Sequence, residues 1–297
     1  MSDLQSGNQN LKTLLNSEGV RKRFSDMLGE NAGSFISTIL TVVNSNNKLK
    51  ECTPVSILSA AATAAALKLP INPSLGLAHI IPFKTGNNYV ATFQLGWRGY
   101  VQLAMRSGQY KRINASPVCE GQIKEIDFVT GDIIRGEKIS NKIVGYLAYF
   151  ELLNGFTKSL YMTIDEIKAH AMKYSKSYGY DIKSGRKTSV WSSNFDSMAE
   201  KTVLKLLISK YGIISIDSRN TDMALALKAD QSMVDSDGSY RYIDNEQSEE
   251  NLISFSDVTL LQDTPSYDDT SVDESTEYAE EHFYSNEDGK NSFYNKN

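Results

Sequence analysis

The sequence predicts an α+β protein with an antiparallel β-sheet, packed helices and an acidic C-terminal tail. Apolar residues recur at helical spacing from residue 11 to residue 43, which predicts amphipathic helices. From residue 77 to 161 the pattern changes to β-branched and aromatic runs interrupted by glycine and asparagine, which predicts strands and turns. After residue 230 the apolar content falls and Ser, Asp, Glu and Asn dominate, a composition typical of disordered segments.

Three regions follow from these changes in composition. We expect residues 1–50 to form N-terminal helices and residues 51–230 to form an α+β core, to which the basic residues described below assign DNA binding and annealing. Residues 231–297 are expected to be a largely disordered acidic tail on which partners dock. Without that tail the chain is still long enough to bury a substantial hydrophobic core.

The N-terminal part is predicted to be helical in three places. The apolar positions between residues 11 and 43 divide at Gly29, which indicates two short helices. Pro54 suits the first turn of a third helix, which continues through the alanine-rich run 60–66. Small side chains allow another helix or another subunit to approach closely, and this helix and residues 1–50 are our candidates for subunit contacts.

Turn signals divide the region that follows. Turns are expected at residues 84–88, at Gly121 and at Gly131. Asn154-Gly155 separates two strand-like runs, 143–153 and 156–162, and is the strongest short-range signal for a hairpin.

Helices and a loop are predicted after this hairpin. Thr163 and Glu166 have the capping-box pattern, which starts a helix that reaches about Tyr174. Residues 175–190 offer little to bury and are predicted to be an exposed loop, and residues 194–211 are predicted to be a final helix.

The charges are divided unevenly along the chain. Residues 1–230 hold 28 Lys and Arg against 19 Asp and Glu, whereas residues 231–297 hold 3 against 17. A basic body attracts phosphate, and an acidic tail can compete with that phosphate or recruit partners. Nucleic acid is therefore the first partner that the composition predicts.

The sequence shows no recognisable catalytic constellation. The run Gly179–Thr188 departs from the phosphate-loop motif in its spacing, and the three histidines are far apart. Acidic residues that a metal-dependent nuclease would need are dispersed. We therefore expect no enzyme activity, no nucleotide cofactor, and magnesium at most as a counterion for DNA.

The expected cellular location follows from cysteine usage and hydropathy. The chain has two cysteines and neither a signal-peptide run nor a stretch long enough to span a membrane. We expect a cytoplasmic protein without disulfides and without a membrane partner.

Basic and aromatic residues occur together in several stretches, a pattern that suits phosphate contacts and base stacking. Lys201 and Lys205 share the single polar stripe of a helix that is otherwise apolar, so we predict that they line a groove. Ordinary solvated lysines are the alternative, and Trp97 and Tyr100 are equally compatible with the core. The predicted DNA-binding residues are Trp97, Arg98, Tyr100, Arg106, Lys111, Arg112, Lys176, Lys183, Arg186, Lys187, Trp191, Lys201 and Lys205.

A series of motifs, taken in order, resembles the RecT branch of the RecT/Redβ phage recombinases. The resemblance covers about residues 50–215. Met105 stands where an arginine often precedes the Arg-Ser-Gly, and residues 121–127 depart from the family's Glu-x-Asp-x-Phe pattern. The motifs are Pro54–Ala66, Leu67-Lys68-Leu69 with Asn72-Pro73, Leu75-Gly76 with Ala78, Ile81-Pro82-Phe83, Gln94–Gly99, Arg106-Ser107-Gly108, and Trp191 with Met198–Thr202.

The resemblance implies an ATP-independent single-strand annealing protein of homologous recombination, encoded by a phage or prophage and acting in the bacterial cytoplasm. It also implies a positively charged DNA groove, binding to single-stranded DNA and annealed duplex, and self-assembly into rings or helical filaments. For the tail, the predicted partners are a phage exonuclease and the host single-strand binding protein. The alternative is a non-enzymatic single-strand coating protein, or a structural assembly protein without annealing activity.

Overall fold

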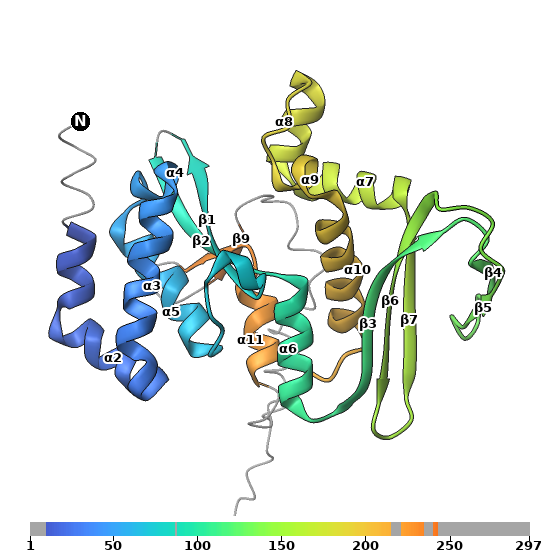
Figure 1. Cartoon of the computed structure of the whole chain (residues 1–297), viewed down its shortest axis with the longest axis horizontal. Helices are drawn as coiled ribbons and strands as arrows, with labels where there is room; N and C mark the ends of the chain where they lie inside the picture. The colour runs from blue at the N-terminus through green and yellow to red at the C-terminus, as the bar shows by residue number, and fades with distance from the viewer. Residues whose placement is uncertain (1–9, 87, 215–220, 235–239, 243–297) are drawn as a thin grey trace, which may run out of the picture. The chain divides into compact units, whose positions relative to one another are not determined.

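Runs of helices and runs of antiparallel strands follow one another along the chain (Figure 1), which confirms the predicted α+β class. The computed structural model describes residues 10–86, 88–214, 221–234 and 240–242. All of these residues belong to the compact unit Met1–Leu252, which is distinct from the unit Ile253–Asn297.

The N-terminal region is helical, as predicted. A helical segment at residues 10–16 precedes α2 (Glu18–Leu28), the 3₁₀ turn η1 (Gly29–Asn31), α3 (Ala32–Ser45) and the short α4 (Asn47–Lys50). Gly29 follows α2 with a φ of 57°, a conformation that favours glycine, so the break lies where the sequence indicated it. The rings of Phe24 and Phe35 lie 5.8 Å apart and join α2 to α3.

The alanine-rich helix α5 (Pro54–Ala66) begins at the predicted proline. Its residues Ala60, Ala61, Ala64 and Ala65 are buried, because α5 packs against α2, β1, β2 and β8 of its own chain. The close approach that these small side chains allow is therefore used within the subunit. This is the close approach to another helix that the alanine run allows, and contact of this helix with another subunit stays a prediction.

A β-hairpin follows α5. After the 3₁₀ turn η2 (Pro73–Leu75), strands β1 (Ala78–Thr85) and β2 (Asn88–Leu95) pair antiparallel, from Ala78 opposite Leu95 to Thr85 opposite Asn88. This places the turn where it was predicted.

Residues 97–107 lie in the region predicted to form strands and turns, but they form the helix α6 (Trp97–Ser107). Its buried residues Tyr100, Leu103, Ala104 and Ser107 have helical spacing, a periodicity hidden within the surrounding β-like sequence. Glycine is required at the start of α6, since a Cβ on Gly96 would lie 2.1 Å from the carbonyl oxygen of Gly76.

Three strands form the main sheet, in the order β3-β6-β7. They are β3 (Tyr110–Cys119), β6 (Ile143–Leu152) and β7 (Thr157–Thr163), and the last two are joined across Asn154-Gly155 as predicted. Between β3 and β6, strands β4 (Ile123–Ile126) and β5 (Ile133–Arg135) form a separate hairpin. Gly121 and Gly131 adopt positive φ at the predicted turns.

A run of helices follows the sheet. Thr163 and Glu166 form the predicted capping box at the start of α7 (Ile164–Tyr174). The helix predicted at residues 194–211 is α10 (Phe195–Tyr211), which packs against β3, β6 and β7 (Figure 1). Contrary to the prediction it is not the final helix, because another helix follows at residues 221–229. Between α7 and α10, α8 (Lys176–Ser184) and α9 (Val190–Ser193) replace most of the loop predicted at residues 175–190.

The chain continues past the predicted boundary at residue 230. Helix α11 (Thr221–Ala229) leads into β8 (Ser232–Val234), which pairs with β9 (Tyr240–Tyr242). The amide of Gln231 donates to the carbonyl of Phe93 at 3.0 Å, so this segment packs against β2. The folded part therefore extends beyond Asp230, and the remainder of the predicted tail, residues 243–297, lies outside the described residues.

Candidate nucleic-acid interface

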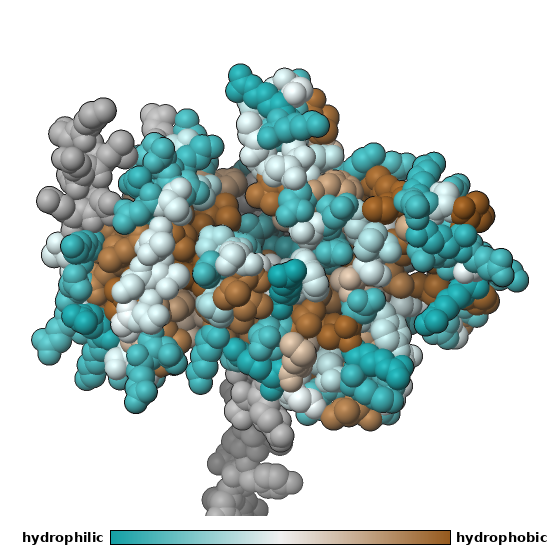
Figure 2. Space-filling view, in the orientation of Figure 1, coloured by the Kyte–Doolittle hydropathy of each residue, from teal (hydrophilic) through white to brown (hydrophobic). Residues whose placement is uncertain are grey.

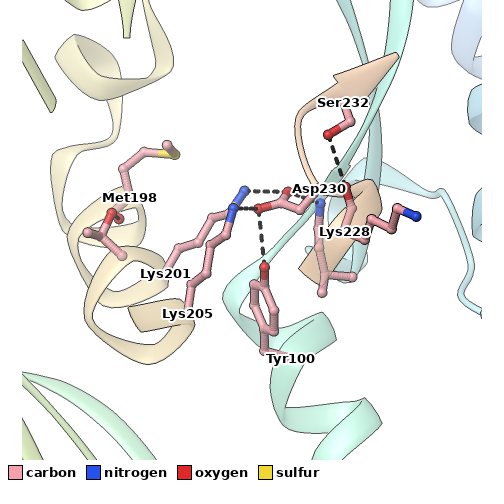
Figure 3. A network of polar contacts seen from close by, with 9 residues as sticks. Tyr100, Met198, Lys201, Lys205, Lys228, Asp230 and Ser232 are labelled. Carbon is pink, nitrogen blue, oxygen red and sulfur yellow. Dashed lines mark hydrogen bonds and ion pairs between the residues drawn. The ribbon is translucent and has the colours of Figure 1, made fainter. Parts of the chain in front are cut away.

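Lys201 and Lys205 lie on α10 and both contact the carboxylate of Asp230 (Figure 3). Lys201 Nζ donates to Oδ1 and Lys205 Nζ donates to Oδ2, each at 2.9 Å. The amide of Leu95 donates to Oδ1 at 2.9 Å, and the hydroxyl of Tyr100 donates to Oδ2 at 3.1 Å. Four donors from β2, α6 and α10 thus surround one acceptor, and we call these five residues the Asp230 cluster.

The Asp230 cluster is largely closed to solvent. Asp230 is 1% exposed and Lys201 is 4% exposed, whereas the side chain of Lys205 is 21% exposed. The prediction that both lysines line a groove is wrong for Lys201, because its ammonium faces inward to Asp230. Only Lys205 brings the charge of this cluster to the surface.

Burial and pairing change the pKa values in this cluster. Burial lowers the pKa of Lys201 to about 8, and the charge of Asp230 acts against that change. Burial alone would raise the pKa of Asp230, but the two ammonium groups hold it at about 2. At neutral pH the carboxylate and Lys201 are therefore both charged.

Two histidines lie near the lysines without adding charge. Burial and the charge of Lys201 lower the pKa of His79 on β1. Burial, Lys205 and Lys173 lower the pKa of His170 on α7 to about 4. His170 is therefore neutral at pH 7, and the cations that act on it are the ammonium groups of Lys205 and Lys173.

Trp97 and Tyr100, both predicted to stack bases, differ in environment. Tyr100 is fully buried and donates to Asp230, so its ring offers no face for a base, and this prediction is wrong for the structure described. Trp97 is half-buried, and the guanidinium carbon of the exposed Arg98 lies 5.5 Å from the centre of its ring. Of the three residues predicted in this stretch, Trp97 and Arg98 are accessible.

The remaining basic residues near the sheet are paired within the chain. Arg106 donates to the carbonyl of Leu67 at 2.7 Å and forms an ion pair with Asp222. Lys111 and Arg112 contact Glu151 on β6, at 2.6 Å and 3.3 Å, and both remain exposed. Binding of a phosphate at these positions would compete with acids already in place.

The α8–α9 segment presents its basic residues outward. Lys176, Lys183, Arg186 and Lys187 are all exposed, and the guanidinium of Arg186 lies over the ring of Tyr180 at 5.9 Å. Figure 2 shows that hydrophilic residues cover much of the end of the molecule formed by α8. Trp191, by contrast, is buried against Tyr178 and Phe195, so its predicted stacking on DNA is wrong.

Asp181 holds this segment in shape. It is 1% exposed and accepts from the amide and hydroxyl of Thr188, the amide of Ser189 and the hydroxyl of Ser192, at 2.6–2.8 Å. Burial opposes ionisation, but these hydrogen bonds keep the pKa of Asp181 well below its usual range. The sequence interpretation missed both Asp181 and Asp230, and an acid close to apolar residues in a short helical stretch was the available signal for each.

The structure does not gather all the predicted residues into one site. It brings Lys201, Lys205 and Tyr100 together around Asp230, and it places the four exposed basic residues on α8 and just after it. Within the described residues no group of three metal-ligating side chains occurs. In the same part of the chain no helix is long and apolar enough to cross a bilayer.

A mixed α+β unit with exposed basic and aromatic side chains has the features of a nucleic-acid-binding protein. The chain belongs to the RecT family, whose sequence model matches residues 33–249. Membership of this family supports a single-strand annealing protein of DNA recombination, a class whose members are generally not enzymes.

Two relatives illustrate the range of similarity. The chain is 43% identical to an uncharacterized protein, YqaK, of Bacillus subtilis (strain 168) over 217 residues, which are 72% of this chain and 71% of that protein. It is 25% identical to Protein RecT of Escherichia coli (strain K12) over 256 residues, 81% of this chain and 90% of that protein.

Proposed function

We propose that this chain coats single-stranded DNA as an oligomer and pairs it with its complement without ATP. The match of the RecT family to residues 33–249 carries this proposal, because that family consists of annealing proteins. The excess of 28 basic over 19 acidic residues in residues 1–230 supports it, since phosphate contacts supply most sequence-independent affinity.

The accessible basic residues are the proposed grip on the strand. Arg98, Lys183, Arg186 and Lys187 are exposed, and the side chain of Lys205 is partly exposed. Contacts to phosphate leave the bases available, so that complementarity is tested by Watson–Crick pairing and not by side chains. Neither a nucleotide nor a metal is needed for this scheme, apart from magnesium as a counterion.

Annealing must be measured to test the proposal. Two complementary labelled oligonucleotides are mixed with the full chain in the absence of nucleoside triphosphate, and pairing is followed by fluorescence energy transfer. We expect acceleration for the complementary pair and none for a non-complementary control. Binding without acceleration would favour a coating protein, and the absence of binding would favour a structural assembly protein.

The proposed partners and cellular location follow from the proposed role in annealing DNA. We expect an assembly of many subunits on DNA in the bacterial cytoplasm. An exonuclease or a single-strand binding protein would dock on residues 231–297, which hold 17 acidic residues and 3 basic ones. Loss of co-purification on deleting residues 243–297 would support tail docking, and unchanged co-purification would exclude it.

A further inference from the structure

The Asp230 cluster has the composition of a phosphate site that is occupied by an internal carboxylate. Two ammonium groups, a hydroxyl and a main-chain amide converge on one anion, and all four donors reach it within 3.1 Å. Donors of these kinds also bind phosphate oxygens. The donors come from β2, α6 and α10, whereas the acceptor alone comes from the junction of α11 and β8.

The two lysines share one carboxylate but differ in their access to solvent. Both ammonium groups contact Asp230 at 2.9 Å. Lys201 is buried, whereas the side chain of Lys205 is 21% exposed, so Lys205 is the lysine of this cluster that a phosphate can reach. An ammonium carries three donors, and therefore Lys205 can contact a phosphate while its contact with Asp230 weakens.

We propose that Asp230 competes with a DNA phosphate for Lys205 and so limits how tightly the protein holds a single strand. The inference rests on the proposed function, because it concerns the same DNA-binding surface. A limited grip suits annealing, since a strand that is held too tightly is slow to adjust its register against a complement.

The structure supports competition at Lys205 more than at Lys201. Lys201 is buried in the core, so a phosphate cannot reach its ammonium while the surrounding elements stay in place. Lys205 lies one helical turn further along α10, at the rim of the cluster, near the neutral His170. Substitution of either lysine leaves the other paired one-to-one with Asp230, so the two variants are matched in charge.

The first experiment measures affinity for labelled oligo-dT by the full chain, with and without the substitution D230N. The asparagine side chain has the size of the aspartate but not its charge, so we expect about fivefold tighter binding and a steeper dependence on salt. The D165N variant removes the same charge from a side chain that is 95% exposed, and we expect less than about a twofold change. Weaker binding by a folded D230N protein, or a change equal to that of D165N, would overturn the proposal.

The second experiment asks whether the gain passes through Lys205. In the double variant D230N/K205M we expect the tighter binding to disappear. An equal gain in the presence and absence of Lys205 would show that Asp230 acts elsewhere.

Single lysine variants keep the test open if D230N does not fold. K205M should weaken binding about fivefold and reduce the salt slope by about 0.7, the value for one single-strand phosphate contact. K201M should weaken binding less than K205M, and equal or larger loss in K201M would overturn the proposal. If the unmodified chain does not bind oligo-dT, the proposed function fails; if it binds and K205M is unchanged, only this inference fails.

Discussion

Two buried aspartates, each 1% exposed and each accepting from four donors, organise two regions of opposite character. Asp181 is bound by neutral groups 7 to 11 residues away, and it shapes a segment that presents basic residues outward. Asp230 is bound by lysines 25 and 29 residues away and draws them inward. A lysine among apolar residues is therefore a poor indicator of a binding surface until its acceptor is known.

The largest effect should follow from removing the carboxylate of Asp230. In D230A two ammonium groups lose their buried partner, and breaking a buried ion pair typically costs about 3–5 kcal/mol. We expect a loss of this size in the free energy of unfolding, measured by urea denaturation. K187M, at an exposed position in the α8–α9 segment, is the control and should be near neutral. A D230A protein as stable as K187M would remove the contrast between the regions.

The free energy of unfolding should depend on pH in the acid range, because the pKa of Asp230 differs between the folded and the unfolded chain. The pKa of Asp230 is about 2 in the folded chain and about 3.9 when unfolded, so its charge stabilises the fold above about pH 4. That contribution, roughly 2 kcal/mol, is lost as pH falls toward about 2. Unfolding free energies of D230N and of the unmodified chain should therefore converge between about pH 5 and about pH 2.5, with D165N as the comparison. Parallel loss in all three proteins would contradict the assignment.

Substitution of the exposed basic residues of the α8–α9 segment should change DNA binding and leave stability nearly unchanged. Replacing Lys183, Arg186 and Lys187 together by Ala should reduce the salt slope for oligo-dT by about 2, at about 0.7 per lost phosphate contact. Thermal unfolding should change little, because all three side chains are exposed. An unchanged salt slope would show that this segment does not grip DNA.

The effect of D181N should be confined to the α8–α9 segment, because the partners of Asp181 are local. The substitution removes the charge that accepts from Thr188, Ser189 and Ser192. We expect faster hydrogen exchange at the amides of residues 188–193, with little change in the core strands β3 and β6. Exchange that accelerates across the whole sheet would show that Asp181 supports more than its own segment.

Features governed by neighbours in the chain were predictable from the sequence. The capping box at Thr163, the Asn154-Gly155 hairpin and the proline at the start of α5 all occur as predicted, because each depends on contacts within a few residues. The excess of positive charge and the ordered motifs likewise identified the class of protein. These predictions do not depend on which helices and strands pack against one another.

Tertiary structure decided which basic and aromatic residues are accessible. The sequence pattern did not predict helix α6, because its residues lie in a stretch that resembles strands. Its glycines are explained by the backbone of Gly76 and Leu77, which lies too close to leave room for a Cβ. Tyr100, Trp191 and Lys201 are buried by the packing of several elements. The sequence by itself determined the charge and the local turns of this protein. The direction in which Lys201 and Lys205 point was decided by Asp230, since a buried charge must find its counterion wherever the fold places it.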